Sequence, residues 1–263
     1  MSVDERASQA GSMTVLAPPA APDAGRSPGS LIVAWQHPTS RRISPVGLLE
    51  HGLAPGYRFR YLRQAPLVED FAPFIGFPAW ERTYTAERLF PLFAQRIMSP
   101  RRPDYSQYLR QLDLSPDATP WEQLARSEGR RAGDTVQVFP IPTVSVDGSS
   151  RCWFLLHGVS HINPGADRPA LHPGDALTVR NDPENPVNPD AMMVCTQEGV
   201  GLGYVPDLLL EHLRALQCEG PIDLIVTHVN GREAPAHLRL LVQLDGRAPA
   251  GYAPMTGPRW DTY

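Results

Sequence analysis

The chain has 263 residues, of which 42% are hydrophobic, enough for one large domain or two ordinary ones. All 24 basic residues are arginine, and the absence of lysine excludes standard P-loop proteins, protein kinases and Schiff-base enzymes. Residues 31–130 hold 13 Arg against 10 acidic residues (about +3), and residues 151–247 hold 7 against 12 (about −5). The second balance argues against tight nonspecific nucleic-acid binding. No apolar run reaches the roughly 18 to 20 residues of a membrane helix, so we expect a cytoplasmic protein.

Residues 1–30 are rich in Ala, Pro, Ser and Gly, and we interpret them as a disordered leader. Three strand-like runs follow within residues 31–62: LIVAWQ, ISPVGLLE and YRFRYL. In the third run Tyr57, Phe59 and Tyr61 alternate with arginines, which puts the aromatic rings on one face. This pattern favours core packing over a surface on which bases stack.

Helical signals come next. Residues 84–98 show apolar spacing of three and four, interrupted by Pro91, and Pro103 is well placed to open a second helix. Thr119 and Glu122 have the capping-box spacing, with Pro120 at the first helical position and Gly129 as a stop. Residues 31–130 therefore read as an α+β domain.

From residue 131 the pattern becomes all-β. Residues 131–150 are expected to be a linker or a first strand, and residues 151–247 a β-domain with one helix from about residue 207 to a Gly220 stop. Short strands with turn signals at intervals indicate a barrel or a sandwich. Candidate strands are residues 135–141, 151–159, 175–180, 191–196, 201–206, 221–229 and 236–244. Residues 248–263 are expected to be a surface tail.

The residues that usually carry catalysis lack a supporting pattern. His157 and His161 have the i,i+4 spacing of zinc ligands, but they lie at a strand end and have no adjacent Glu as general base. The serines have no nucleophile-elbow glycines. The three cysteines form no CxxC pair, so neither a disulfide framework nor a zinc ribbon is indicated, and we expect buried thiols. We expect no enzymatic activity, no metal and no cofactor.

The stretch NDPENPVNPD (residues 181–190) lies between two candidate strands and holds three prolines, three asparagines and three acids. Its spacing does not fit a calcium loop, and its prolines prevent that wrapping. Asn and Asp side chains can hydrogen-bond nearby backbone while Pro fixes φ. The stretch therefore predicts a rigid crossover between strands.

LTVRNDPENPVNPDAMMV, followed by VGLGYVPDLLLEHL, resembles the HIRAN domain family over about residues 152–245. The shared features are a strand, a D/E-P-x-N-P-x-D-x-x-A bridge, a second strand, and a hairpin that ends in a Gly-Tyr pair before a helix. The resemblance implies an OB-like β-barrel with one helix, which would follow the α+β domain predicted for residues 31–130. It also implies binding to the 3′ end of single-stranded DNA, as in family members attached to DNA-remodelling helicases.

Carried over by position, the resemblance places the family's DNA-reading bridge asparagine at Asn185. The family's bridge Tyr-Asp pair falls on Val187 and Asn188, and its Arg-Tyr pair falls on Ser160 and His161. We expect an aromatic ring to stack on a base, an arginine to meet a phosphate, and amides to bind sugar or base. The candidate nucleic-acid-binding residues are His161, Arg180, Asn185, Asn188 and Tyr204.

Residues 31–112 are similar to the N-terminal subdomain of HipA-type toxin kinases, through the three strand-like runs, FIGFPAW and LFPLFAQRI. In that family the region contributes to contacts with an antitoxin. Three functions stay open for a two-domain bacterial protein. It recognises single-stranded, end or damaged DNA; or it is a protein-interaction module in a toxin–antitoxin, phage-defence or transcription-control complex; or it is a nuclease or phosphatase built on its acidic residues.

Overall fold

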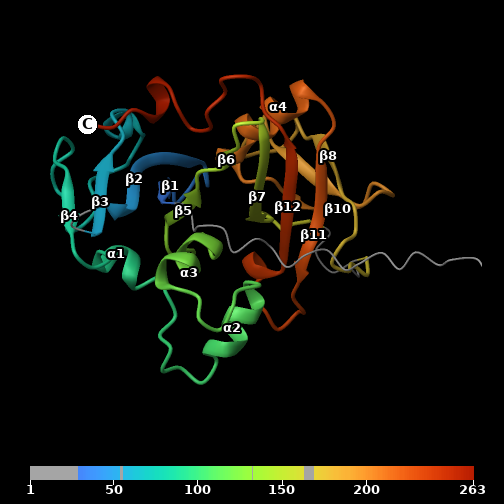
Figure 1. The fold of residues 1–263 in the computed structure, drawn as a ribbon, viewed down its shortest axis with the longest axis horizontal. Helices are drawn as coiled ribbons and strands as arrows, with labels where there is room; N and C mark the ends of the chain where they lie inside the picture. The colour runs from blue at the N-terminus through green and yellow to red at the C-terminus, as the bar shows by residue number, and fades with distance from the viewer. Residues whose placement is uncertain (1–28, 54–55, 132, 163–168) are drawn as a thin grey trace, which may run out of the picture.

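The computed structural model describes residues 29–53, 56–131, 133–162 and 169–263. The leader expected at residues 1–30 lies outside these ranges up to residue 28. Figure 1 shows two β-rich lobes side by side, which we call the first lobe (residues 29–140) and the second lobe (residues 141–247). The chain is mostly β-sheet, with several antiparallel sheets and four α-helices among the described residues.

The first lobe contains a five-stranded antiparallel sheet in the order β4-β3-β2-β1-β5. The three runs predicted within residues 31–62 are confirmed as strands. The strands are β1 (Ser30–Gln36), β2 (Ile43–Leu53), β3 (Gly56–Tyr61), β4 (Tyr84–Ala86) and β5 (Val136–Pro140).

Strand β4 corrects the helix predicted over residues 84–98. Pro91 cannot lie inside a helix that begins at Tyr84, because its ring would clash with the carbonyl four residues earlier. Tyr84 and Thr85 are instead good strand formers, and they pair with β3. The helix α1 (Pro91–Ala94) begins only at the proline.

Strand β5 belongs to the first sheet and not to the second half, where the sequence pattern had placed it. It pairs with β1 along its length. Val136 and Val138 join the core of the first lobe, whereas Phe139 joins that of the second. Burial on both faces explains its nearly continuous apolar sequence, which resembles that of any buried strand.

Two further helices complete the first lobe, α2 (Tyr105–Gln111) and α3 (Pro120–Arg126), together with the 3₁₀ turn η1 (Ala65–Leu67). The capping box predicted for α3 is confirmed. The Glu122 amide donates to the Thr119 hydroxyl at 3.2 Å, and the Thr119 amide donates to the Glu122 carboxylate at 2.7 Å. Gly129, the predicted stop, has φ +57.

The second lobe holds two antiparallel sheets, one in the order β10-β9-β8 and one in the order β11-β12-β7-β6. The helix predicted from residue 207 is confirmed as a 3₁₀ turn that continues into an α-helix, with Gly220 as its cap. The elements of the second lobe are β6 (Thr143–Val144), β7 (Ser149–Leu155), β8 (Thr178–Asn181), β9 (Met192–Cys195), β10 (Gly201–Tyr204), η2 (Asp207–Leu209), α4 (Leu210–Glu219), β11 (Asp223–Val229), η3 (Ala236–Leu238) and β12 (Leu240–Arg247).

Two isolated bridges join these sheets. His157, just past β7, pairs with Tyr204 of β10, and Ala176, just before β8, pairs with Ile225 of β11. Further backbone hydrogen bonds support the second junction, including one of 2.8 Å from the Leu177 amide to the Leu224 carbonyl. The strands of the two sheets therefore follow one another around one shared core.

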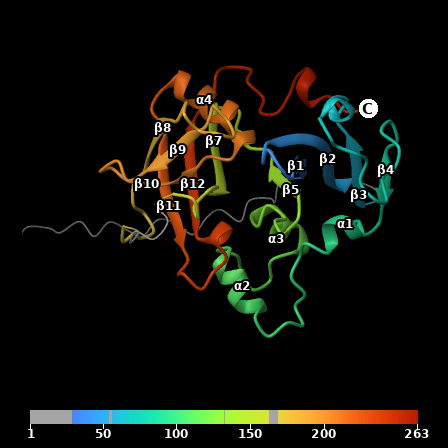
Figure 2. The same ribbon diagram turned by 180° about the vertical axis from the view of Figure 1, so that it is seen from behind.

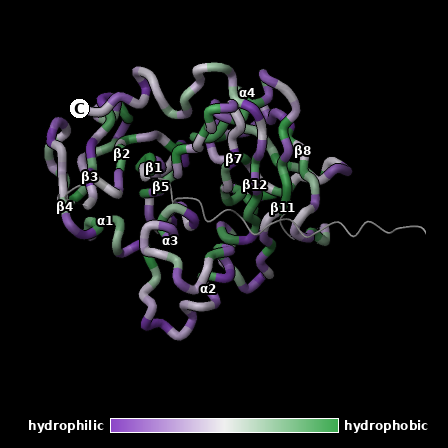
Figure 3. Tube along the Cα trace, viewed as in Figure 1, coloured by the Kyte–Doolittle hydropathy of each residue, from purple (hydrophilic) through white to green (hydrophobic). Residues whose placement is uncertain are grey.

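That core also receives the first lobe. Ile32 and Phe139 project from the first sheet into the cluster built by the second lobe and α4. Leu31 and Val33, which alternate with Ile32 along β1, point the other way into the aromatic core of the first lobe. Figure 3 shows the hydrophobic segments concentrated along the central strands. The first sheet is thus covered on both faces.

The C-terminal segment runs from β12 back to the first lobe, as both ribbon views show (Figures 1 and 2). Thr262 forms a β-bridge with Leu62, and the Arg63 amide donates to the Asp261 carbonyl at 2.8 Å. Met255 and Trp260 are buried in the core of the second lobe. Trp260 lies inside the 3₁₀ turn η4 (Pro258–Trp260), and Met255 lies just before that turn. Residues 248–263 therefore tie the lobes together and are more than a surface tail.

None of the helices in the described part of the chain is both long enough and apolar enough to cross a membrane.

Candidate nucleic-acid interface

The sheet β10-β9-β8 carries one row of side chains on its outer face. Arg180 of β8 lies opposite Met193 of β9, and Met193 lies opposite Tyr204 of β10. Residues next to them in these strands, such as Val194, point into the core. Arg180 is exposed and Met193 and Tyr204 are half-buried. We call these three residues the cross-strand row.

One end of the row is closed by the bridge (residues 182–190), which connects β8 to β9. The Tyr204 hydroxyl donates to Asp182 Oδ2 at 2.7 Å, and the Asn185 side chain hydrogen-bonds the same hydroxyl. Burial, with the hydrogen bond to Asp182, raises the pKa of the Tyr204 phenol, so the ring stays neutral and keeps its donor. Asp182 was not among the candidate residues predicted from the sequence.

The bridge holds its own shape through Asn side chains, as the sequence predicted. Asn185 Oδ1 accepts the amides of Val187 and Asn188 at 3.0 and 3.1 Å. Asn188 Oδ1 accepts the Asp190 amide at 3.0 Å. These are Asx-type turns, in which a side chain replaces a backbone acceptor. The bridge is therefore organised locally.

Asn188 lies away from the cross-strand row. Its Nδ2 donates to Asp207 Oδ1 at 2.9 Å, at the start of η2. Both ends of its amide are thus engaged inside the protein, where they hold the bridge against the helical segment. Arg214 of α4 supports the same junction, donating to the Asp190 carbonyl at 3.0 Å and pairing with its carboxylate at 3.2 Å.

The turn after β7 supports the other side of Tyr204. Gly158 has φ +65, and a Cβ added there would come within 2.9 Å of the Tyr204 ring. A side chain at this position would therefore push the ring out of the row. His161 closes the turn through an amide hydrogen bond of 2.8 Å to the Gly158 carbonyl, and its own side chain is exposed.

The structure thus gathers Arg180, Asn185 and Tyr204 of the five predicted residues, adds Asp182 and Met193, and leaves His161 on the adjoining turn. Asn188 serves the far side of the bridge. An open hollow of about 570 Å³ also lies on that side. It is lined by Asn181, Pro183, Pro189, Asp190, Met192, Arg214, Gln217 and Cys218.

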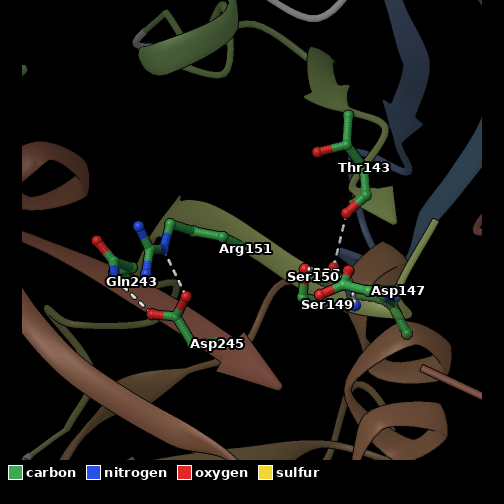
Figure 4. Close-up of polar contacts among 8 residues, drawn as sticks. Thr143, Asp147, Ser149, Ser150, Arg151, Gln243 and Asp245 are labelled. Atoms are coloured by element: carbon green, nitrogen blue, oxygen red, sulfur yellow. Dashed lines mark hydrogen bonds and ion pairs between the residues drawn. The ribbon is translucent and has the colours of Figure 1, made fainter. Parts of the chain in front are cut away.

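A serine–histidine pair lies in the core of the second lobe. Ser150 Oγ is 3.0 Å from His212 Nε2. The same hydroxyl donates to the Thr143 carbonyl at 2.8 Å (Figure 4). Both side chains are buried, and His212 Nδ1 has no hydrogen-bond partner. Burial lowers the pKa of His212 to about 4. Without an orienting acid and without access to solvent, this pair fits a structural role.

The outer face of β7 and β12 nearby carries charged and polar side chains that pair with one another. Arg151 pairs with Asp245 across β7 and β12, and the Gln243 side chain donates to the same carboxylate (Figure 4). These groups satisfy one another. Within the described ranges, no three His, Cys, Asp or Glu side chains gather closely enough to hold a metal ion.

The cysteines are separate free thiols. The expectation of buried thiols is confirmed for Cys152 and Cys195 and is wrong for Cys218, which is exposed near the end of α4. Burial raises the pKa of Cys152 to about 12, the opposite of what a nucleophilic thiol needs.

Comparison with known proteins gives one structural match. No family model matches the chain. No curated protein matches it in sequence. Among solved structures, the chain is similar to the crystal structure of the HIRAN domain of human HLTF. The match covers 42% of this chain and 80% of that chain, with 15% sequence identity and a TM-score of 0.29.

Proposed function

We propose that the chain is a non-enzymatic DNA-binding protein that recognises single-stranded DNA or a DNA end. In this proposal the second lobe is an OB-like barrel, and the ligand lies along the cross-strand row beside the bridge. The observation that carries it is the row itself, which presents a guanidinium and a phenol ring on one exposed sheet face. Aromatic stacking and arginine–phosphate contacts are the main sources of affinity for single strands.

The roles follow from the geometry. Arg180 contacts a phosphate, and the Tyr204 ring stacks on a base. Asp182 and Asn185 hold the Tyr204 hydroxyl, so the ring is oriented before the ligand arrives, which reduces the entropy lost on binding. His161, on the adjoining turn, contacts the next base. The bridge motif and its resemblance to the HIRAN family support the same assignment.

The proposed contact involves few phosphates. The second predicted domain carries about −5 charges, so nonspecific attraction along the backbone is weak. For single strands the logarithm of the affinity falls with the logarithm of salt concentration by about 0.7 per phosphate contact. With Arg180 as the only arginine of the row, we expect a slope near −0.7, far shallower than that of a protein with a basic groove.

The test is fluorescence anisotropy at low salt with oligonucleotides labelled at either end. We expect Tyr204→Leu to weaken binding about tenfold, because one stacked base is worth roughly 1–3 kcal/mol. Arg180→Ala should weaken binding by a similar factor of about ten through loss of the phosphate contact. Arg110→Ala, which removes an exposed arginine from α2, is the control and leaves binding unchanged. The proposal would be contradicted if tens of micromolar protein bound neither an oligonucleotide with a free 3′ end nor one with a free 5′ end.

A protein-interaction module is the second candidate, and exposed apolar side chains of the first lobe favour it. Leu67 is 85% exposed and Ile75 is 98% exposed, both in the proline-rich segment after β3. The likeness of residues 31–112 to the HipA N-terminal subdomain also favours a protein partner, and it stays a prediction. A stoichiometric partner that the wild-type chain retains, and that a Leu67→Ser, Ile75→Ser variant loses, would support this function over DNA binding.

A further inference from the structure

A carboxylate from the first lobe contacts the segment that pairs with Tyr204, at one end of the DNA site proposed above. Glu128 follows α3 and is 2% exposed. Its Oε2 is 2.7 Å from His157 Nε2, and its Oε1 accepts the Leu155 amide at 3.4 Å. Figure 2 shows α3 on the side of the first lobe that faces the second lobe. The contact therefore links the lobes through one buried side chain.

The amide that Glu128 accepts lies beside the segment that pairs with Tyr204. Successive amides of a strand point to opposite edges. Leu156 donates to the Leu240 carbonyl of β12 on one edge. Leu155 and His157 face the other edge, where the Glu128 carboxylate accepts the first amide and the Tyr204 carbonyl accepts the second, at 2.9 Å. Glu128 thus occupies the edge position next to Tyr204.

The residue is held there at a cost in backbone strain. Glu128 has φ +55, a left-handed conformation that side chains other than Gly and Asn rarely adopt. Its carbonyl accepts the Val138 amide of β5 at 2.8 Å, which anchors it to the first sheet. Strain that persists at a buried position needs compensating contacts. The contacts to His157 and Leu155 provide that compensation.

We infer that Glu128 is a positioning residue that sets the Tyr204 end of the cross-strand row from the first lobe. By fixing the His157 ring and the Leu155 amide at the end of β7, it holds the His157–Tyr204 bridge and Gly158, against which the Tyr204 ring lies. The inference rests on the proposed function for its effect on DNA, and on geometry alone for its effect on Tyr204.

Glu128→Gly removes the carboxylate and relieves the left-handed strain, so the fold is spared part of the loss. We expect hydrogen exchange of the His157 and Tyr204 amides to rise tenfold or more, and affinity for a single-stranded oligonucleotide to fall about tenfold. Asp134→Asn is the matched control. Asp134 is half-buried and pairs at 2.8 Å with the buried Arg96, which also donates to the Gly129 carbonyl next to Glu128. Asp134 accepts the Val136 amide of the first lobe and not an amide of β7.

Glu128→Gln supplies the rescue. Its amide oxygen can accept the Leu155 amide while its nitrogen donates to His157, which shifts the imidazole proton from Nε2 to Nδ1. We expect near-wild-type exchange and binding, with the change of tautomer visible in the ¹⁵N shifts of the His157 ring. An unchanged tautomer would show that the side chain at position 128 does not bond the His157 ring, and would contradict the inference.

The outcomes separate the two proposals. Wild-type exchange at the His157 and Tyr204 amides in Glu128→Gly overturns the inference, whatever the DNA result. An equal rise in Asp134→Asn also overturns it, because the effect is then general destabilisation. Increased exchange confined to Glu128→Gly supports the inference, and absence of DNA binding by the wild type then counts against the proposed function only.

Discussion

The two lobes have cores of different composition. Among the described residues, seven of the 16 buried side chains in the core of the first lobe are aromatic, against three of 26 in the core of the second. Their polar anchors differ too. Tyr61 and Tyr84 bind loop backbone in the first lobe, whereas His212 and Ser150 bind each other in the second.

This difference follows from how each core is covered. Irregular chain after β3 packs against one face of the first sheet, and large rings fill the uneven space that loops leave. Regular strands and α4 enclose the second core, and aliphatic side chains interdigitate well between regular elements. We therefore expect the stability of the first lobe to depend on a few aromatic rings. We expect the stability of the second lobe to depend on many small aliphatic contributions and on pH.

The largest effect is expected from Phe77→Ala. Phe77 is 3% exposed, and its ring centroid lies 4.6 Å from that of Phe59 and 5.0 Å from that of Tyr84. Removing a buried ring from such a cluster costs about 3–5 kcal/mol of unfolding free energy. Chemical denaturation measures the loss. Phe77→Leu, which keeps most of the volume, should recover more than half of it, and a loss below about 1 kcal/mol for Phe77→Ala would contradict an aromatic core.

Acid should act mainly on the second lobe. Burial lowers the pKa of His212 to about 4, from 6.5, and its neighbours Ser150 and the stacked Tyr252 ring offer no charge to stabilise the imidazolium. The unfolded chain binds this proton more readily. The contribution of neutral His212 to the free energy of unfolding is therefore fully present above about pH 6.5. It decreases by up to roughly 1.4 kcal/mol per pH unit as the pH falls, and it is lost once the pH passes about 4.

Thermal unfolding between pH 7 and pH 4 measures this dependence, with His212→Gln as the test variant. Burial beside Arg130 also lowers the pKa of His237 to about 4, so the variant should lose part of the pH slope and not all of it. Tyr61 stays neutral over this range, because a tyrosine ordinarily has a pKa of about 10 and burial raises that of Tyr61 further, to about 12. An unchanged slope in His212→Gln would show that His212 is not the titrating group.

The smallest of the three effects is expected from Tyr61→Phe. The Tyr61 hydroxyl accepts the Phe74 amide at 2.7 Å and donates to the Phe77 carbonyl at 3.0 Å. Its removal leaves both backbone groups without this partner, which costs roughly 1–3 kcal/mol. Denaturation midpoints should fall accordingly, with faster hydrogen exchange at Phe74. Tyr84→Phe, which removes a hydroxyl bound to Ala79 at the edge of the same core, should cost less.

Local signals in the sequence predicted much of this fold. The capping box of α3 and the Asn-based turns of the bridge each depend on residues within a few positions of one another, so spacing alone identifies them. The alternation of Phe59 and Tyr61 with arginines likewise predicted a buried face, and both rings are fully buried. Arg180 and Tyr204 were named as site residues, but their common face came from strand register.

The sequence by itself determined most of the elements, with β4 as an exception, and the shape of the bridge, because their causes are short-range. Only the tertiary structure decided that β5 joins the first sheet, that Asp182 holds the Tyr204 hydroxyl, and that Glu128 lies against β7. These contacts join residues separated by 22 or 29 positions, or strands separated by the whole first lobe. Their partners are selected by which strand edge or buried donor remains unpaired after folding, and no local spacing records that choice.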